Sequence, residues 1–271
     1  MWKHVAQSLP GPSHEAAGSV CQDSHLVRLL GNDDASDSDN GATETIFACV
    51  ADGAGSADHS DVGSALTCQA IANSAEQYLE SHGSFRRLQL DHVLSWFENL
   101  HEKLRSAADL HGCNFRELAT TLCAAILSPE GSFFFQIGDG AITACNNGVY
   151  GVVFWPQSGE YANVTNFVTS DRFKYHFEFQ ATTSKISEIA IFTDGIERLA
   201  LNFESRTPHL PFFQPLFQAV RSSTPGDHLA ADLGKFLQSE SVKNRSDDDK
   251  TLILATRLLG PAEEVQANAV D

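Results

Sequence analysis

Residues 189–195 read Ile-Ala-Ile-Phe-Thr-Asp-Gly, an apolar run that ends in a carboxylate and a glycine. Residues 49–53, Cys-Val-Ala-Asp-Gly, repeat this arrangement. In residues 247–254, Asp-Asp-Asp-Lys-Thr-Leu-Ile-Leu, the carboxylates come just before the apolar run. Short apolar runs are consistent with buried strands, and a glycine after the aspartate leaves the backbone free to turn sharply. Carboxylates that meet at strand ends form an oxygen-lined site that suits Mg²⁺ or Mn²⁺.

Two more aspartates extend this pattern. Asp139 lies between two glycines after an apolar segment, and Asp23 follows a cysteine and a glutamine. A turn explains an isolated Asp-Gly pair equally well, because both residues are common in turns. Turns do not require the strand-end placement that Asp52, Asp194 and Asp248 share. These three are therefore the principal candidate ligands.

Composition favours one globular domain with an acidic surface. The chain has 271 residues, 42% of them hydrophobic, and 18 basic against 35 acidic residues give a formal net charge of −17. This charge argues against nucleic acid or an anionic membrane as the main partner. An acidic protein that binds a phosphate needs a local positive charge, and a bound divalent metal would supply it.

The sequence has no recognisable membrane span or export signal. No stretch approaches the roughly 20 apolar residues that cross a bilayer, and the N-terminus lacks a basic start followed by an apolar run. Six cysteines are dispersed without a Cys-x-x-Cys pair. We therefore expect reduced thiols in a cytoplasmic protein, without a zinc site.

Helical and strand patterns are grouped along the chain and do not alternate strictly. Apolar residues recur at helical spacing in residues 61–82 and 91–111, which predicts two long helices. Further helices are predicted over residues 196–202, 212–222 and 227–238, and strands over residues 19–30, 44–50, 119–127, 132–137, 141–145, 149–154, 165–169, 175–180, 188–193 and 251–256. This grouping favours an α+β fold, a layered sandwich with antiparallel sheets inside and helix pairs outside.

One domain is predicted over residues 1–260. Residues 31–43 are rich in Asp, Ser, Asn and Gly, and we interpret them as an acidic hairpin loop because their spacing does not fit a calcium-binding loop. Residues 261–271 are polar and rich in alanine, and we predict a disordered tail.

The candidate carboxylates can hold a two-metal site. Two divalent ions about 3.5–4 Å apart share a water, lower its pKa and present it as hydroxide to a phosphorus atom. We assign Asp52 as the bridging carboxylate, with the Gly53 carbonyl oxygen on one side, and Asp194 and Asp248 as ligands of the second ion. Asp23 is expected outside the ligand set, where it accepts hydrogen bonds from metal-bound waters.

Two residues are candidates for proton transfer. Asp139 is predicted to hold a third, weakly bound ion, one of whose waters would donate a proton to the leaving alkoxide. His14 lies in a loop upstream of Asp23, where it could contact a phosphate or shuttle a proton. A solvated surface histidine is the alternative interpretation of His14.

Six motifs resemble those of the PPM-type (type 2C) metal-dependent protein serine/threonine phosphatases and follow that family's order. They are Asp52-Gly53-Ala54-Gly55 for D-G-x-G, Gly63-Ser64-Ala65 for the start of the first long helix, Ala119-Thr120-Thr121-Leu122 for G-T-T, Ile137-Gly138-Asp139-Gly140 for G-D-S, Phe192-Thr193-Asp194-Gly195 for T-D-G, and Asp248-Asp249-Lys250-Thr251 for the terminal strand. Residues 11–14, 21–23 and 159–163 are most similar to a bacterial branch.

The resemblance implies a four-layer α-β-β-α sandwich of two antiparallel sheets flanked by helix pairs. It implies two tightly bound Mn²⁺ or Mg²⁺ ions in a cleft at one edge, and a variable flap at about residues 155–186. The implied activity is hydrolysis of phosphoserine and phosphothreonine on proteins by direct attack of a metal-bridging hydroxide. The implied partners are phosphorylated proteins, opposite a serine/threonine kinase, and we expect a monomer.

The chain departs from the pattern of the animal members at three positions. Ala54 stands where they have a histidine that acts as general acid, and Gln22 stands where they have glutamate. Gly18 stands where they carry a phosphate-binding arginine, with no basic residue nearby. The proton donor is therefore left open between a metal-bound water and His14.

Two other functions remain open from the sequence. A pseudophosphatase would keep the fold and bind a phosphoprotein without turnover, and manganese-dependent hydrolysis of p-nitrophenyl phosphate would separate it from an enzyme. A phosphomonoesterase for a small metabolite is the other alternative, which turnover on phosphopeptides and on sugar phosphates would distinguish.

Overall fold

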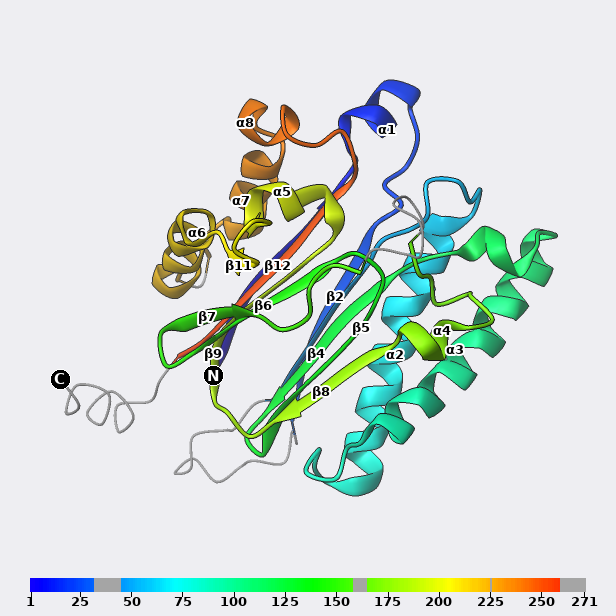
Figure 1. Ribbon diagram of the computed structural model, residues 1–271, viewed down its shortest axis with the longest axis horizontal. Coiled ribbons are helices and arrows are strands. Elements are labelled where there is room, and N and C mark those ends of the chain that lie inside the picture. The colour runs from blue at the N-terminus through cyan, green and yellow to red at the C-terminus, as the bar shows by residue number, and fades with distance from the viewer. Residues whose placement is uncertain (32–44, 158–164, 225, 259–271) are drawn as a thin grey trace.

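A computed structural model describes residues 1–31, 45–157, 165–224 and 226–258 of the chain. Two antiparallel sheets lie face to face at the centre, and helices cover the outer face of each (Figure 1). The predicted α+β four-layer sandwich is therefore confirmed. Within the described residues, no helix has the length and apolar character needed to cross a membrane.

Within the described residues each large sheet has five strands, all paired antiparallel. The first sheet has the order β1 (Trp2–Leu9), β12 (Lys250–Arg257), β9 (Ile186–Phe192), β6 (Ala141–Asn146) and β7 (Val149–Val152). The second has the order β2 (Ser24–Leu30), β3 (Thr45–Ala51), β4 (Leu122–Ser128), β5 (Gly131–Ile137) and β8 (Glu178–Thr182). Two short strands, β10 (Leu201–Asn202) and β11 (Thr207–Pro208), form a separate pair.

The long helices lie on opposite sides of the sandwich (Figure 1). On the second sheet lie α2 (Ser60–His82) and α3 (Leu90–His111), and on the first lie α6 (Leu210–Ser222) and α7 (Leu229–Leu237). The short helices are α1 (Pro12–Ala17), α4 (Phe173–His176), α5 (Glu197–Ala200) and α8 (Glu240–Lys243), with 3-10 turns η1 (Phe115–Leu118) and η2 (Asp194–Ile196).

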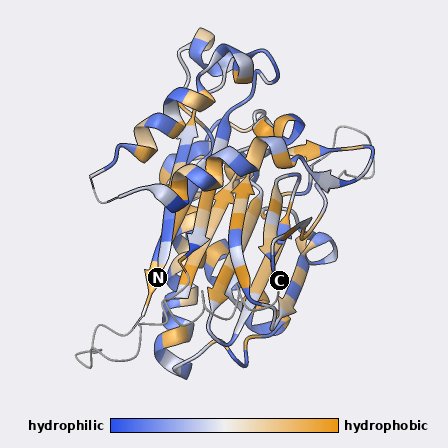
Figure 2. Ribbon diagram, turned by 90° about the vertical axis from the view of Figure 1, so that its left-hand side faces the viewer, coloured by the Kyte–Doolittle hydropathy of each residue, from blue (hydrophilic) through white to orange (hydrophobic). Residues whose placement is uncertain are grey.

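The strands that carry the aspartate motifs are buried on both faces. On β3, Ile46, Ala48 and Val50 face the other sheet, and Phe47 and Cys49 pack against the layer of α2 and α3. On β9 and β12 the same alternation divides the side chains between the inter-sheet core and the layer of α6 and α7. Strands buried on both faces read as continuous apolar runs. Figure 2 shows predominantly hydrophobic strands at the centre of the molecule and helices of mixed hydropathy around them.

Several element predictions differ from the structure. The edge strand β1 was not predicted, since its sequence is half polar, and β2 begins at Ser24 and not at residue 19. The strand predicted over residues 165–169 is wrong, because these residues lie in coil and a turn. Residues 175 and 176 belong to α4, so the next strand begins only at Glu178.

Some sequence predictions concern residues that the structure does not describe. Most of the acidic loop at 31–43, the segment 159–163 and the tail at 261–271 lie outside the described residues. Of the segment at 155–186 that was expected to form a flap, the described part includes β8, which pairs with β5 as a strand of the second sheet.

A buried carboxylate ties β9 to β7, α6 and β12, and its removal should destabilise the fold. Glu188 is 5% exposed and accepts hydrogen bonds from the Tyr150 hydroxyl, the Arg221 guanidinium and the Thr256 hydroxyl. We expect Glu188→Ala to lower the free energy of unfolding by about 1–3 kcal/mol, which is several degrees in Tm for a chain of this size. Thermal denaturation measures it, with exposed Glu204→Ala as the control, and equal Tm values for the two variants would contradict it.

Candidate metal centre

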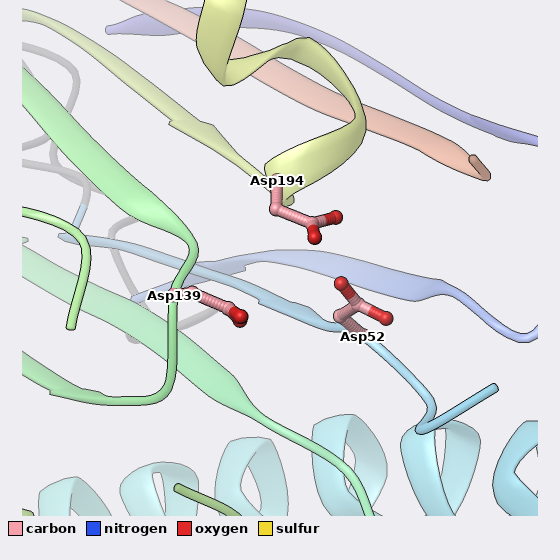
Figure 3. Close-up of side chains that lie close together, drawn as sticks. All are labelled: Asp52, Asp139 and Asp194. Atoms are coloured by element: carbon pink, nitrogen blue, oxygen red, sulfur yellow. The ribbon is translucent and has the colours of Figure 1, made fainter. Parts of the chain in front are cut away.

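Three carboxylates converge where strands of both sheets end. Asp52 follows β3, Asp194 follows β9, and Asp139 lies between β5 and β6. One carboxylate oxygen of each lies within 4.8 Å of those of the other two (Figure 3). Because β3 and β9 belong to different sheets, the sandwich packing, and not either strand alone, brings these side chains together.

The backbone of Asp52 is fixed by hydrogen bonds to the loop before β4. Its carbonyl oxygen accepts bonds from the Thr120 hydroxyl and the Thr121 amide, both 2.8 Å long. Its amide donates to the Thr121 hydroxyl at 3.0 Å. The Thr-Thr pair of residues 120 and 121 therefore holds the Asp52 carboxylate in position.

The glycines after the two aspartates allow close backbone contacts and do not form left-handed turns. A Cβ on Gly53 would lie 2.6 Å from the Gln22 carbonyl oxygen and 2.8 Å from that of Ser60. A Cβ on Gly195 would overlap the Asp249 carbonyl oxygen. Neither glycine has a positive φ. The expected sharp turn is therefore not the reason for glycine here, because the requirement is space for the neighbouring main chain.

Burial and like charges make the metal-free cluster unfavourable. Burial raises the pKa of Asp194 to about 6, with further contributions from Asp139 and Asp248. Burial also raises the pKa of Asp52 well above its usual range, and Asp23 and Asp194 add to this effect. The pKa of Asp139 is raised by burial, although the Thr165 hydroxyl donates to its carboxylate at 2.7 Å.

The donor set fits a divalent cation. Among the described residues, Oδ1 of Asp194 is buried without a hydrogen-bond partner. A buried acceptor without a partner costs free energy, and adjacent carboxylates repel one another. An ion bound among Asp52, Asp139 and Asp194 would remove both penalties. Oxygen ligands of this kind are those that Mg²⁺ and Mn²⁺ prefer.

Asp23 lies behind the cluster and does not line the cleft. It is 5% exposed, and its Oδ2 accepts a 2.7 Å hydrogen bond from the Thr193 hydroxyl. Its Oδ1 has no partner among the described residues. Burial raises the pKa of Asp23 to about 8. Hydrogen bonds from the Thr193 and Thr251 hydroxyls stabilise the charged carboxylate and so act in the opposite direction. Asp23 is therefore separated from the carboxylates that line the cleft.

Asp248 and Glu197 flank the cluster. Asp248 lines the same cleft but is exposed and lies outside the group of three within 4.8 Å. Glu197, on α5, was not selected from the sequence, where nothing distinguishes it from other surface glutamates. Burial raises the pKa of Glu197 to about 7, and the charges of Asp194 and Asp139 contribute.

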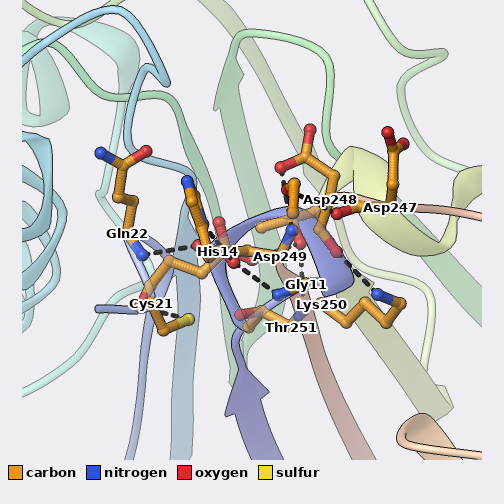
Figure 4. A network of polar contacts seen from close by, with 12 residues as sticks. Gly11, His14, Cys21, Gln22, Asp247, Asp248, Asp249, Lys250 and Thr251 are labelled. Carbon is orange, nitrogen blue, oxygen red and sulfur yellow. Dashed lines mark hydrogen bonds and ion pairs between the residues drawn. The ribbon is translucent and has the colours of Figure 1, made fainter. Parts of the chain in front are cut away.

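A buried aspartate that the sequence analysis passed over positions His14. Asp249 accepts hydrogen bonds from the amides of Gly11 (2.7 Å) and Gln22 (2.6 Å), and His14 Nδ1 lies 2.6 Å from its Oδ1 (Figure 4). The His14 side chain is 18% exposed and that of Asp249 3%. The triplet at 247–249 was the available signal, but only the fold distinguishes the exposed Asp248 from the buried Asp249.

The resulting cleft has a volume of about 360 Å³ and is acidic. Its walls comprise Ser13, His14, Asp52, Gly53, Ala54, Gly55, Ser56, Thr121, Asp139, Thr165, Phe167, Asp194 and Asp248. Among these described lining residues there is no lysine or arginine to pair with the carboxylates, and His14 is the one basic side chain. The cleft thus unites every predicted site residue except Asp23, and adds Thr121, Thr165 and the Asp249 contact to His14.

Comparisons with known proteins agree with this geometry. The model of the family described as protein phosphatase 2C matches residues 10–238. "Serine/threonine-protein phosphatase 3" of Escherichia coli K12 is 34% identical over 258 residues, which cover 94% of this chain and 98% of that protein.

Solved bacterial structures share the fold at low sequence identity. PppA of Pseudomonas aeruginosa aligns with a TM-score of 0.59 and 16% identity, over 95% of this chain and 98% of its own. The serine/threonine phosphatase Stp1 of Staphylococcus aureus aligns with a TM-score of 0.58 and 15% identity, over 96% of each chain.

Neutralising one buried carboxylate should stabilise the metal-free protein. We expect Asp52→Asn to raise Tm in EDTA by a few degrees, because it removes a buried ionisable group that faces like charges. The same substitution should reduce the rise in Tm that Mn²⁺ causes in the wild type, since ligand binding to the native state is the source of that rise. Differential scanning calorimetry with and without Mn²⁺ measures both effects.

The matched control is Asp58→Asn, an exposed aspartate six residues later, which should change neither value. A lower Tm for Asp52→Asn in EDTA, together with an undiminished Mn²⁺ response, would show that the carboxylate cluster is not a metal site.

Proposed function

This chain belongs to the protein phosphatase 2C family, and we propose that it hydrolyses phosphoserine and phosphothreonine on proteins with Mn²⁺ or Mg²⁺. The observation that carries the proposal is the convergence of Asp52, Asp139 and Asp194 in a cleft whose lining residues include no lysine or arginine. A phosphate dianion would be repelled by these carboxylates unless cations neutralise them first. Metal dependence therefore follows from the same charges that form the site.

We assign two ions to Asp52, Gly53, Asp194 and Asp248, as predicted from the sequence. Asp139, which the sequence predicted to hold a third and weaker ion, lies with Asp52 and Asp194 at the centre of the group. When bound, the ions would supply a hydroxide nucleophile by lowering the pKa of a shared water. Asp52 would serve as the bridging carboxylate, because one of its oxygens lies within 4.8 Å of those of Asp139 and Asp194 and its backbone is fixed by Thr120 and Thr121. Asp23 would orient coordinated waters from behind.

His14 would exchange protons with the phosphoryl group at the rim of the cleft. Asp249 holds the Nδ1 side of the ring, and this leaves Nε2 as the nitrogen available to the cleft that His14 lines. A carboxylate that orients a histidine in this way fixes its tautomer and ring position. With Ala54 in the position of the usual general acid, His14 is our candidate for the proton donor to the leaving alkoxide.

Neither alternative gains support from the site. A pseudophosphatase is disfavoured because Asp52, Asp139, Asp194 and Asp248 are all present. We propose proteins as the substrates because the related E. coli protein is named a serine/threonine-protein phosphatase. An opposing serine/threonine kinase and a monomeric state are parts of the same proposal.

Asp194→Asn should abolish manganese-dependent phosphatase activity and leave the protein folded. The amide keeps the shape of the side chain but loses the charge that would hold a metal. We expect kcat on a phosphothreonine peptide to fall by more than tenfold, at least about 1.4 kcal/mol of barrier. Steady-state kinetics with Mn²⁺ measure the fall, and circular dichroism checks the fold.

The matched control for this test is Asp109→Asn, an exposed residue near the end of α3. Residual activity of Asp194→Asn above a tenth of the wild-type value would remove Asp194 from the ligand set. Wild-type turnover of sugar phosphates in preference to phosphopeptides would overturn the protein-phosphatase assignment itself.

His14→Ala should reduce kcat/KM on phosphopeptides more than on p-nitrophenyl phosphate, whose leaving group needs little protonation. The expected loss on peptides is about 10²-fold, the lower range for general acid catalysis, with a change in one limb of the pH–rate profile. His14→Asn serves as the matched variant, because its amide can still donate to Asp249 but cannot transfer a proton. If His14→Asn keeps wild-type activity, His14 acts only through its hydrogen bond to Asp249.

A further inference from the structure

A second pocket, separate from the acidic cleft, opens on the side of the molecule that carries α5, α6 and α8. It has a volume of about 670 Å³. Its apolar wall includes Leu201, Phe203, Phe212, Leu216 and Phe236. Phe203 is 49% exposed at this wall and packs edge to face against Trp155 with ring centroids 5.3 Å apart. Exposed aromatic side chains held by a neighbour are typical of binding surfaces.

Positive charge gathers at this pocket although the chain as a whole is acidic. Arg198 and Arg245 line it together with the polar residues Asn202, His209 and Ser241, and no carboxylate is among the described lining residues. Both arginines are exposed, and neither is in the ion pairs found among the described residues, although the charge of Arg198 partly offsets the raised pKa of the adjacent Glu197. In a chain with a net charge of −17, two such guanidiniums beside an apolar wall favour a ligand that carries carboxylates around an apolar group.

The pocket is adjacent to the acidic cleft along two chain segments. Arg198 follows Asp194 by four residues, and Arg245 precedes Asp248 by three. An extended chain covers at most roughly 3.3–3.6 Å per residue. The Cα atom of each arginine therefore lies within about 15 Å of the Cα atom of an aspartate of the cleft. One peptide can therefore reach both sites when roughly four to eight residues separate its two contact points.

We propose that this pocket is a docking site for a segment of the phosphoprotein substrate in which apolar residues are flanked by glutamate or aspartate. This inference rests on the proposed function, because it assumes that the phosphorylated residue enters the acidic cleft. The apolar side chains would occupy the wall of Phe203, Phe212 and Leu216, and Arg198 and Arg245 would bind the flanking carboxylates. Guanidinium–carboxylate pairs of this kind provide specificity and faster association.

The test uses phosphothreonine peptides that carry Glu-Leu-Phe-Glu five residues before or after the phosphothreonine. Two comparison peptides replace both glutamates with lysine, or Leu-Phe with Ser-Ser. Arg198→Glu/Arg245→Glu should raise KM for the Glu-Leu-Phe-Glu peptide by about tenfold without changing kcat. Hydrolysis of p-nitrophenyl phosphate, which is too small to span both sites, should not change, and the comparison peptides should show the higher KM already with the wild type.

The matched control is Arg86→Glu/Arg87→Glu, which makes the same change in net charge at two exposed arginines between α2 and α3. This variant should keep the wild-type KM for every peptide. Phe203→Ser provides a second variant without any change in charge. It should raise KM for the peptides that contain Leu-Phe and leave the KM of the Ser-Ser peptide unchanged. An equal KM for the wild type and the Arg198/Arg245 variant, or an equal loss on p-nitrophenyl phosphate, would overturn the proposal.

Direct binding separates a failure of this inference from a failure of the proposed function. An unphosphorylated, fluorescein-labelled Glu-Leu-Phe-Glu peptide should bind the wild type and the Arg86/Arg87 variant in anisotropy, and should not bind the Arg198/Arg245 variant. This result would support the docking site even if no phosphopeptide were hydrolysed. A wild-type dimer that the Arg198/Arg245 substitutions dissociate in sedimentation velocity, or binding of decanoate without binding of the peptide, would assign the pocket to a different occupant.

Discussion

Repulsion between carboxylates at one edge of the sandwich is the constraint on which the site depends. Three carboxylate oxygens, one each from Asp52, Asp139 and Asp194, lie within 4.8 Å of one another. Burial together with neighbouring charges raises the pKa of each one. Such a cluster persists only because the surrounding fold fixes its members. A bound cation would reduce the repulsion between the carboxylates. The packed carboxylates therefore destabilise the metal-free protein, and in the proposed function a bound metal would remove this repulsion and allow the acidic cleft to accept a phosphate.

Close contacts between backbone segments hold the cluster in place. Gly53 passes the carbonyl groups of Gln22 and Ser60, and Gly195 passes that of Asp249, at distances that exclude a side chain. Asp249 in turn binds the amides of Gly11 and Gln22 and contacts His14. These contacts join four segments around one point: the N-terminal loop, the end of β3, the end of β9 and the start of β12. A substitution at either glycine would displace the carboxylates even though the glycine itself need not touch the substrate.

Local sequence was sufficient where a signal depends on one element. The continuous apolar runs of β3, β9 and β12 identified strands buried on both faces, and the spacing in α2 and α3 identified helices. It was insufficient for β1, a half-polar edge strand whose eight residues pair with β12 from the opposite end of the chain. It also failed at residues 165–169, whose side chains suit a strand but whose backbone lies in coil and a turn against the loop before β4.

By itself, the sequence determined the layered α+β architecture, the acidic character of the protein and the aspartates from which its site is built. These properties follow from composition, apolar periodicity and the place of a charged residue at the end of an apolar run. The tertiary structure alone decided that Asp139 joins Asp52 and Asp194 at the centre, that Asp248 stays exposed while Asp249 is buried against His14, and that Arg198 and Arg245 share a pocket. Distance, burial and pKa arise between elements remote in sequence, so only the packing of the two sheets sets them.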